Sequence, residues 1–404
     1  MSRRIVIAGG GAAGFFAAIT VAEADPHAQV LLLERGREVL GKVRISGGGR
    51  CNLTHDCPDP RELVRAYPRG HRELLGPFHR FGPTDTIAWF AQRGVATKTE
   101  ADGRMFPQSD DAQTIIDCLV QAARRAGVEV RTQAPVTRLV PPPEPEAPWR
   151  IYCGDTELEA DRLMLATGSS TRIWDLLADL GHSIVPPVPS LFTFQIEDAR
   201  LEGLAGLSVP AATLAVAGES PVQGPVLITH WGLSGPAVLR LSAWAARTLH
   251  ACDYRCTLAI DWLGLGKQGA EAWVEQARRQ AAAKALRRSQ PDALPLRLWE
   301  RLLQAAGIDP ALRWADLTRV QMQALADQLA AGSYAVRGKS TFKEEFVTAG
   351  GVDLREVDFR HFASRRLPGL FLAGEILDID AITGGYNFQA AWTGGWHAGL
   401  AMVS

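Results

Sequence analysis

Glycines and an acidic residue near the start of the chain have the spacing of a dinucleotide-binding turn. A short apolar run leads into Gly9, Gly11 and Gly14, and a second apolar run ends at Glu34. This order predicts strand, glycine turn, helix and strand. Gly9 permits the tight turn, Gly11 lets backbone approach a pyrophosphate, and Gly14 lets the helix pack closely on the sheet. Glu34 is placed to accept hydrogen bonds from an adenosine ribose, while the helix N-terminus offers N–H groups to the pyrophosphate.

A secretory signal peptide is the competing interpretation of this first segment. Arg3 and Arg4, an apolar stretch and the small residues Ala22 and Ala24 imitate one. Three consecutive glycines interrupt the stretch, however, and cleavage would remove the phosphate turn. We therefore interpret the segment as the first strand and helix of the mature protein.

A second strong pattern lies near the C-terminus. A buried-type apolar strand ends at Gly374 and Glu375, and a glycine turn then opens a helix near Asn387 and Phe388. An NAD domain does not need this addition, whereas the ribityl chain and ring system of FAD extend beyond the pyrophosphate. Glu375 can accept from a ribityl hydroxyl, and the helix N-terminus can bind the flavin carbonyl beside N1 and favour negative charge there. The alternative is an ordinary strand, loop and helix.

Two further segments carry weaker signals. Small residues end a predicted strand at Ala166, Thr167 and Gly168, where backbone can pass close to a cofactor. Residues 46–52 have the sequence SGGGRCN, which exposes N–H groups that can form a concave anion-binding array; a flexible loop is the alternative. Arg50 in this loop could hold a substrate carboxylate or a flavin oxygen, and the sequence does not separate the two.

Composition sets the broad class of the protein. The 404 residues exceed one simple core and suggest two or three domains. The 43 Lys and Arg against 44 Asp and Glu give a net charge of −1, so no nucleic-acid partner is expected. The six cysteines form no CxxC pair and no Cys/His metal spacing, which predicts no metal site and reduced thiols in a cytoplasmic protein. No apolar run has the length of about 18 or more residues that a membrane span needs.

The pattern of predicted elements changes twice along the chain. Short β-like runs with turns between them begin near residue 191, and helical patterns fill 266–331. We therefore expect an inserted module whose chain returns to complete the first sheet. The predicted parts are a first FAD-binding segment 1–190, a β-barrel segment 191–265, a helical subdomain 266–331, a barrel return 332–347 and a C-terminal FAD-binding segment 348–404.

These motifs together resemble the HI0933-like (YhiN- and BaiN/RdsA-type) family of NAD(P)/FAD-dependent oxidoreductases. The matching stretches span nearly the whole chain; they are residues 9–14, 46–52, 103–107, 229–236, 348–352 and 374–389. The resemblance implies an α/β fold: a glutathione-reductase-like FAD-binding Rossmann domain with an inserted β-barrel and a small helical subdomain. No histidine or cysteine lies in a context suited to covalent attachment of a flavin, so we expect FAD to be bound non-covalently. One departure is the stretch Lys42-Val43-Arg44, where relatives often carry two adjacent lysines, so charge contacts there stay open.

The residues expected to contact FAD combine the motifs with this resemblance. They are Gly9, Gly11, Ala12, Ala13, Gly14, Glu34, Arg35, Lys42, Ser46, Gly48, Gly49, Arg50, Cys51, Asn52, Val136, Ala166, Thr167, Gly168, Gly374, Glu375, Gly385, Tyr386, Asn387 and Phe388.

Candidates for catalysis are fewer. His230 is the expected acid or base, because imidazole titrates near neutral pH, although its glycine-rich surroundings also suit a packed domain junction. Cys51 has no second cysteine nearby, which favours flavin packing over disulfide exchange. Tyr386 suits either the pocket wall or packing.

The expected activity is that of an FAD-dependent oxidoreductase acting on a small organic molecule. The resemblance offers two reactions: NAD(P)H-linked reduction of a carbon–carbon double bond conjugated to a ketone, and oxidation of an amine or amino compound by oxygen. No second GxGxxG is followed by an acidic residue at the spacing of Glu34, so a separate nicotinamide-binding Rossmann domain is not expected, and NADH or NADPH would have to bind directly over the flavin. Alternatives of another class are an RNA-associated flavoprotein and a non-catalytic FAD-bound module. The substrate, the electron donor and the oligomeric state stay open.

Overall fold

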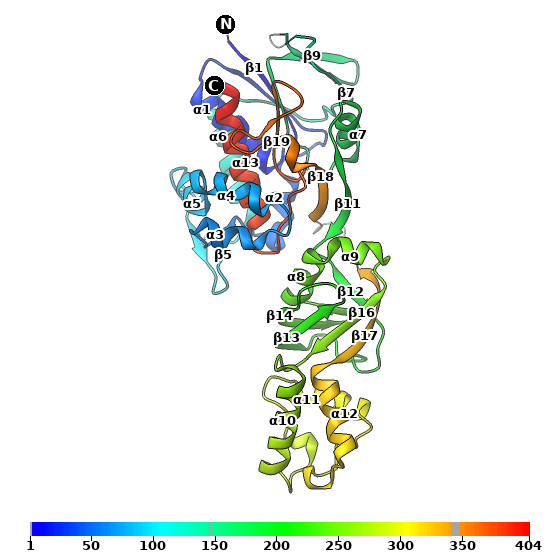
Figure 1. Cartoon of the computed structure of the whole chain (residues 1–404). Helices are drawn as coiled ribbons and strands as arrows, with labels where there is room; N and C mark the ends of the chain where they lie inside the picture. The colour runs from blue at the N-terminus through cyan, green and yellow to red at the C-terminus, as the bar shows by residue number, and fades with distance from the viewer. Residues whose placement is uncertain (1, 145–146, 341–346) are drawn as a thin grey trace. The chain divides into compact units, whose positions relative to one another are not determined.

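The computed structural model describes residues 2–144, 147–340 and 347–404, and in them the chain forms two compact units (Figure 1). The first unit combines the residues up to Val188 with Val347–Ser404. The second unit is Pro189–Phe346, of which 341–346 lie outside the described residues. Most of the predicted barrel return at 332–347 is thus described, but those six positions are not.

The first unit is built on a seven-stranded sheet in the order β19-β20-β21-β10-β1-β2-β6. The strands β21, β10, β1, β2 and β6 are parallel, whereas β19 and β20 add to the edge in antiparallel pairs. The carboxyl ends of the parallel strands therefore share one edge of the sheet. The bounds are β1 (Arg4–Ala8), β2 (Gln29–Leu33), β6 (Glu129–Arg131), β10 (Arg162–Leu165), β19 (Val357–Asp358), β20 (Ala363–Ser364) and β21 (Leu370–Leu372).

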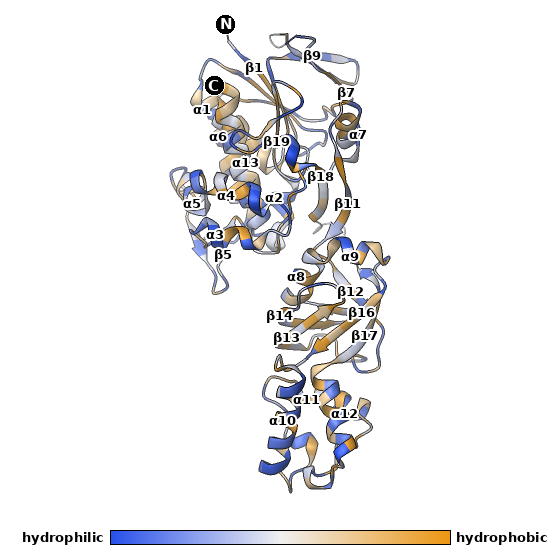
Figure 2. Ribbon diagram, in the orientation of Figure 1, coloured by the Kyte–Doolittle hydropathy of each residue, from blue (hydrophilic) through white to orange (hydrophobic). Residues whose placement is uncertain are grey.

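Two helices from opposite ends of the chain pack against each other beside this sheet. They are α1 (Ala12–Ala24) and α13 (Tyr386–Val403). A Cβ atom added at Gly395 would lie 2.6 Å from the Ala13 carbonyl oxygen, and one at Gly399 would lie 2.7 Å from Thr20 Cβ. Only glycine allows the two backbones to come so close. In Figure 2, α13 is mostly pale or orange, in keeping with its many buried positions.

Smaller elements complete the first unit. Its remaining strands form the sheets β3-β5-β4 and β7-β8-β9 and the pair β11-β18. Their bounds are β3 (Thr54–His55), β4 (Thr97–Thr99), β5 (Arg104–Pro107), β7 (Arg138–Val140), β8 (Trp149–Cys153), β9 (Thr156–Ala160), β11 (Ile184–Ser190) and β18 (Val347–Val352). The helices are α2 (Gly41–Gly49), α3 (Pro60–Leu63), η1 (Val64–Ala66), α4 (His71–Arg80), α5 (Pro83–Ala91), α6 (Ala112–Arg125), α7 (Thr171–Asp179) and η4 (Leu354–Glu356).

The second unit is a closed antiparallel barrel in the order β12-β15-β14-β13-β16-β17. Its strands are β12 (Thr193–Ile196), β13 (Ser208–Val216), β14 (Val222–Thr229), β15 (Gly232–Ser234), β16 (Cys256–Asp261) and β17 (Gly332–Ser340). Between β15 and β16 the chain forms two helices, α8 (Pro236–Trp244) and α9 (Ala246–Ala251), where the sequence had predicted only strands and turns. Pro236 sits at the first position of α8, where its missing N–H costs nothing.

The helical subdomain lies between β16 and β17. It comprises α10 (Gly266–Gln280), η2 (Leu286–Arg288), α11 (Leu296–Ala305), η3 (Trp314–Asp316) and α12 (Arg319–Ala330). Within the predicted helical region 266–331, the first helix ends at Gln280, and Leu286 and Trp314 beyond it are buried in the core. Figure 2 shows α10 largely in blue, as expected of a helix with an exposed polar face.

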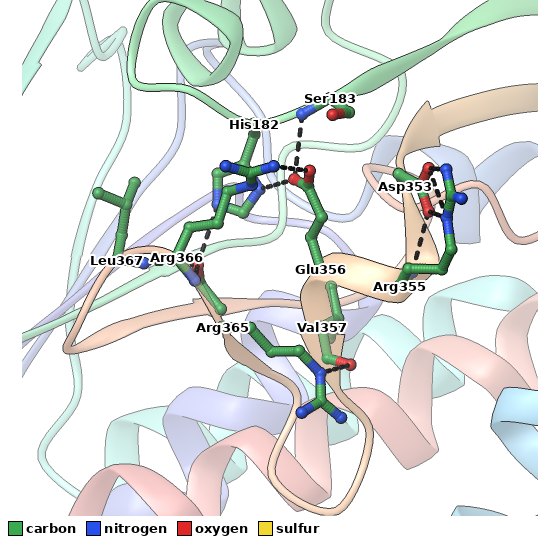
Figure 3. Close-up of polar contacts among 10 residues, drawn as sticks. His182, Ser183, Asp353, Arg355, Glu356, Val357, Arg365, Arg366 and Leu367 are labelled. Carbon is green, nitrogen blue, oxygen red and sulfur yellow. Dashed lines mark hydrogen bonds and ion pairs between the residues drawn. The ribbon is translucent and has the colours of Figure 1, made fainter.

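A polar cluster joins the segment 356–366 to His182 and Ser183, which lie between α7 and β11 (Figure 3). His182 Nδ1 lies 2.7 Å from Glu356 Oε2, and its Nε2 lies 3.0 Å from Ser364 Oγ. Arg366 pairs with Glu356 Oε1 at 2.7 Å, and the Ser183 N–H donates to Oε2 at 3.0 Å. Burial raises the pKa of Glu356, but the hydrogen bonds from Arg366, Ser183 and His182 outweigh it and lower the pKa to about 2.

These elements confirm the predicted fold class, an α/β Rossmann-type domain with an inserted β-barrel and a small helical subdomain. Among the helices of the described residues, none has the length and apolar character to cross a membrane.

Candidate functional site

One edge of the parallel sheet gathers most of the predicted cofactor residues. Gly9 follows β1, Glu34 follows β2, Ala166 follows β10 and Gly374 comes two positions after β21. In open parallel sheets, ligands bind outside the carboxyl ends of the strands. The sequence patterns at the two ends of the chain therefore meet at one edge.

The three glycines of the first turn meet three different surroundings. A Cβ atom at Gly9 would lie 2.3 Å from a backbone oxygen of the loop after β10, and one at Gly14 would lie 1.9 Å from the Gly9 oxygen. A Cβ atom at Gly11 would meet no protein atom within 4 Å. Gly11 precedes Ala12 and Ala13, whose N–H groups begin α1 without intrahelical partners. Open space thus faces a helix N-terminus, as a pyrophosphate requires.

Glu34 is held in place by backbone N–H groups. Its Oε2 accepts from Gly10 N–H at 2.8 Å, and its Oε1 accepts from Gly36 N–H at 2.7 Å. A carboxylate has about four acceptor positions, so capacity for two ribose hydroxyls remains. Val136, farther along the loop after β6, is buried, whereas the Arg35 side chain is exposed.

The ends of β10 and β21 contribute a hydroxyl and a carboxylate. The Thr167 hydroxyl is buried and has no hydrogen-bond partner among the described residues. Gly168 has a positive φ of 62°, and a Cβ atom there would lie 3.7 Å from Glu375 Oε2. Glu375 forms an ion pair with Lys42 and accepts from the Thr348 N–H at 3.2 Å. A buried hydroxyl without a partner is a group that a ligand can satisfy.

The predicted serine–glycine loop begins as a helix and then leaves it. Residues 47–49 have positive φ values of 58°, 69° and 83°, and the Cβ positions at Gly48 and Gly49 meet no protein atom within 4 Å. Ser46 donates to the Val43 carbonyl at 3.0 Å. Cys51 is fully buried, and burial raises the pKa of its thiol to about 12, so the thiolate is not available.

The residue that ends this loop connects it to the C-terminal motif. With its amide group oriented to satisfy both partners, Asn52 accepts from the Gly385 N–H at 3.0 Å and donates to the Thr54 carbonyl at 3.2 Å. Arg50 lies differently: it pairs with Glu100 at 2.7 Å and covers the Phe106 ring at 4.0 Å. Its guanidinium is already engaged by protein groups.

A side chain in the first turn of α13 fixes the loop that precedes the helix. Gly385 is its N-cap residue, with φ 88°. The Asn387 side chain closes this loop, since it accepts from the Ala381 N–H at 2.9 Å and donates to the Ala381 carbonyl at 3.1 Å. Phe388 stacks on Trp392 with ring centroids 5.7 Å apart. The first N–H groups of α13 have no intrahelical partners and can bind an anionic or carbonyl oxygen.

Several residues that support this site were not singled out from the sequence. His55 stacks on Tyr386 with centroids 4.5 Å apart, and its Nδ1 lies 3.0 Å from the Gly384 oxygen. The Tyr67 hydroxyl donates to the Tyr386 carbonyl at 2.6 Å. A buried ion pair between Arg69 and Asp380 anchors the same loop. These contacts join residues more than 300 positions apart, so no local sequence pattern could have predicted them.

His230, the predicted acid or base, lies in the second unit. It is exposed at the turn between β14 and β15. Its neighbour Thr229 has a buried hydroxyl with no hydrogen-bond partner in the described part of the chain. The role of His230 stays a prediction.

Comparison with known proteins assigns the chain to a family. The family model of the HI0933-like protein Rossmann domain matches residues 3–401. The chain belongs to the HI0933-like family. This membership makes the chain an FAD-dependent oxidoreductase.

Curated relatives cover the chain almost completely. A 3-dehydro-bile acid delta(4,6)-reductase from Clostridium scindens is 30% identical and aligns over 99% of both chains. A ribosomal RNA dihydrouridine synthase from Escherichia coli is 29% identical over 99% of this chain and 98% of its own. A protein of the same name from Haemophilus influenzae is 26% identical over 98% of both chains.

Solved structures share the fold of this HI0933-like protein. A 3-ketosteroid-delta4-(5alpha)-dehydrogenase from Rhodococcus jostii superposes with a TM-score of 0.56 at 17% identity, covering 100% of this chain and 97% of its own. A 3-ketosteroid delta1-dehydrogenase from Sterolibacterium denitrificans gives 0.53 at 11% identity, covering 99% of both chains. At such identities the likeness concerns the fold alone.

Proposed function

We propose that this HI0933-like protein uses FAD and NADH or NADPH to reduce a carbon–carbon double bond conjugated to a carbonyl group. The observation that carries the proposal is the chemistry shared by its full-length relatives. One is named for reducing a 3-keto bile acid with double bonds at positions 4 and 6, and two for making dihydrouridine. A 4,6-dien-3-one and the 5,6-bond of uridine are both conjugated to a carbonyl.

Two groups at the sheet edge support the position of FAD. The open space beside Gly11 suits the pyrophosphate, and the buried hydroxyl of Thr167 lacks a protein partner. Glu34 would bind the adenosine ribose and Glu375 the ribityl chain, with the start of α13 at the ring carbonyl. When bound there, FAD supplies two-electron transfer between a nicotinamide and the substrate.

The other predicted contacts belong to the same proposal. The residues of the serine–glycine loop would contact FAD through their backbone atoms; they are Ser46, Gly48, Gly49, Cys51 and Asn52. The thiol of Cys51 is buried, so it is not proposed as a contact. For Arg50, engaged by Glu100, only a backbone contact is proposed.

Reduction of a conjugated bond also requires a proton at the carbon next to the carbonyl. We propose that His230 supplies it, since its imidazole is exposed and forms no hydrogen bond with the described residues that would fix it in a structural role. A His230→Gln protein should retain FAD and its reduction by NADPH, and lose most of kcat, by about 10²-fold. Unchanged kcat would remove His230 from the reaction and leave it the structural role.

The substrate divides the proposal into two cases. A small molecule with a cyclic enone corresponds to the bile acid reductase, whereas uridine within RNA corresponds to the two dihydrouridine synthases. The near-neutral composition led us to expect no nucleic acid, and the names of these two relatives are the specific reason to test it.

A product assay separates these cases. The FAD-loaded protein is incubated under argon with NADPH and either a 4-en-3-one steroid or ribosomal RNA, and products are identified by mass spectrometry. We expect a gain of 2 Da in one substrate. If instead an amine bleaches the flavin and peroxide is released in air, the protein is an oxidase and the proposal is wrong.

A further inference from the structure

An arginine-rich hollow lies on the first unit, away from the sheet edge that carries the cofactor residues. It has a volume of about 870 Å³ and is open to solvent. Its walls come from α4, from the segment 354–365 and from the C-terminal half of α13. Five guanidinium groups line it; they belong to Arg72, Arg80, Arg355, Arg360 and Arg365.

Two acidic side chains, Glu73 and Asp358, share this lining, so positive charge is in excess. Arg365 lies 3.9 Å from Asp358, at the limit of an ion pair, and its Nε donates to the Val357 carbonyl oxygen at 3.1 Å. Arg72 and Arg360 are exposed and form no ion pair with any described residue. They come from opposite walls.

Two further arginines of the lining also have protein partners. Arg355 is held by Asp353, outside the hollow, in a two-pronged ion pair. Arg80 lies over the Trp396 ring at 5.8 Å. Asp353 and Trp396 do not neutralise the guanidinium groups of the other three arginines.

A buried histidine connects the two walls. His397 Nδ1 lies 3.1 Å from the Arg360 carbonyl oxygen, and its Nε2 lies 3.2 Å from the Pro77 carbonyl oxygen. Pro77 belongs to α4 and Arg360 to the turn between β19 and β20. His397 therefore joins the backbone of the two segments that carry Arg72 and Arg360.

We propose that this hollow binds the phosphate groups of a nucleotide or of an RNA strand. Guanidinium groups match phosphate oxygens in geometry and charge, and arginines with no acidic partner gain most from such a ligand. A volume of about 870 Å³ exceeds a single phosphate ion and lies in the range of nucleotide-sized ligands. Phe359 in the lining adds an aromatic side chain on which a base can stack.

The proposed phosphate site is separate from the FAD site. His397 lies eleven positions beyond Tyr386, the first residue of α13, which corresponds to about 16 Å along the helix axis. The lining contains none of the residues expected to contact FAD. The proposal therefore does not depend on which bond the enzyme reduces.

The test compares two double variants of the FAD-loaded protein. Arg72→Gln/Arg360→Gln removes the unpaired charges, and Arg124→Gln/Arg125→Gln removes two exposed charges at the end of α6. Binding of a fluorescein-labelled 12-nucleotide RNA is measured by anisotropy across a salt series, with ADP and inorganic phosphate as competitors. The hollow variant should bind at least about fivefold more weakly and with a shallower salt dependence, whereas the α6 variant should match the wild type.

The competitors identify the source of the phosphate. If the wild type binds the RNA and the Arg72→Gln/Arg360→Gln variant does not, the site binds an RNA strand. If the wild type binds only ADP and the same variant does not, the site binds a free nucleotide. No binding of any phosphate probe, or equal binding by the two double variants, overturns the proposal. Flavin content and enone reduction, measured in parallel, show whether the proposed reaction stands or falls separately.

Discussion

Replacing Gly11 by alanine should separate folding from cofactor binding. The backbone at Gly11 has φ −93°, which alanine adopts without strain, and its added Cβ atom would meet no protein atom within 4 Å. We expect the free energy of unfolding of the FAD-free protein to change by no more than about 1 kcal/mol, the usual difference between glycine and alanine at a helix N-cap.

The cofactor should respond differently. In our account the space beside Gly11 holds the pyrophosphate, so the new methyl group overpacks the complex. Overpacking costs about 1–3 kcal/mol, which corresponds to FAD binding weaker by about 5- to 150-fold. Gly14→Ala is the matched control, because its Cβ atom would lie 1.9 Å from the Gly9 carbonyl oxygen and must disturb the fold itself.

The assay combines two measurements on each protein. Thermal unfolding after removal of FAD reports the fold, and a fluorescence titration with FAD reports the dissociation constant. Gly11→Ala should keep its Tm and lose affinity, while Gly14→Ala should lose Tm. Wild-type FAD affinity in Gly11→Ala would refute the assignment of this space to the pyrophosphate.

Further predictions concern the groups that support the site. Because the pKa of Glu356 is lowered to about 2, its carboxylate contributes about 3 kcal/mol to the free energy of unfolding above pH 4.5, and this contribution is lost as the pH falls toward 2. In urea unfolding at a series of pH values, Glu356→Gln should therefore reduce the loss of stability on acidification. Because burial raises the pKa of Cys51 to about 12, iodoacetamide at pH 8 should not label it in the folded protein, as peptide mass spectrometry would show. Asp380→Asn leaves Arg69 without its buried charge partner and should cost about 3–5 kcal/mol and increase FAD loss on gel filtration; wild-type stability would contradict this.

Local patterns explain which parts of the fold were predictable. The glycine turn and Glu34 belong to a strand–turn–helix–strand unit that is contiguous in sequence, so their spacing alone predicted it. The helices α8 and α9 were missed because they are short and lie between strands, where turn residues such as Gly235 dominate the pattern.

Contacts between distant segments were not predictable in the same way. The stack of His55 on Tyr386 and the ion pair of Arg69 with Asp380 join the first quarter of the chain to its end. The arginine-rich hollow shows a second limit, because a net charge of −1 is a sum over the surface and says nothing of where charges gather. Fold and cofactor class follow from spacing; the supporting contacts require the folded chain.

The central claim, an FAD reductase of conjugated double bonds, is tested most directly by one anaerobic spectroscopic experiment. The purified protein is expected to carry one FAD per chain, released by acid precipitation because it is not covalently bound. NADPH or NADH should bleach its visible absorbance, and a conjugated enone or uridine-containing RNA should restore it without oxygen. A flavin that no nicotinamide reduces, or that no conjugated double bond reoxidises, would contradict the account.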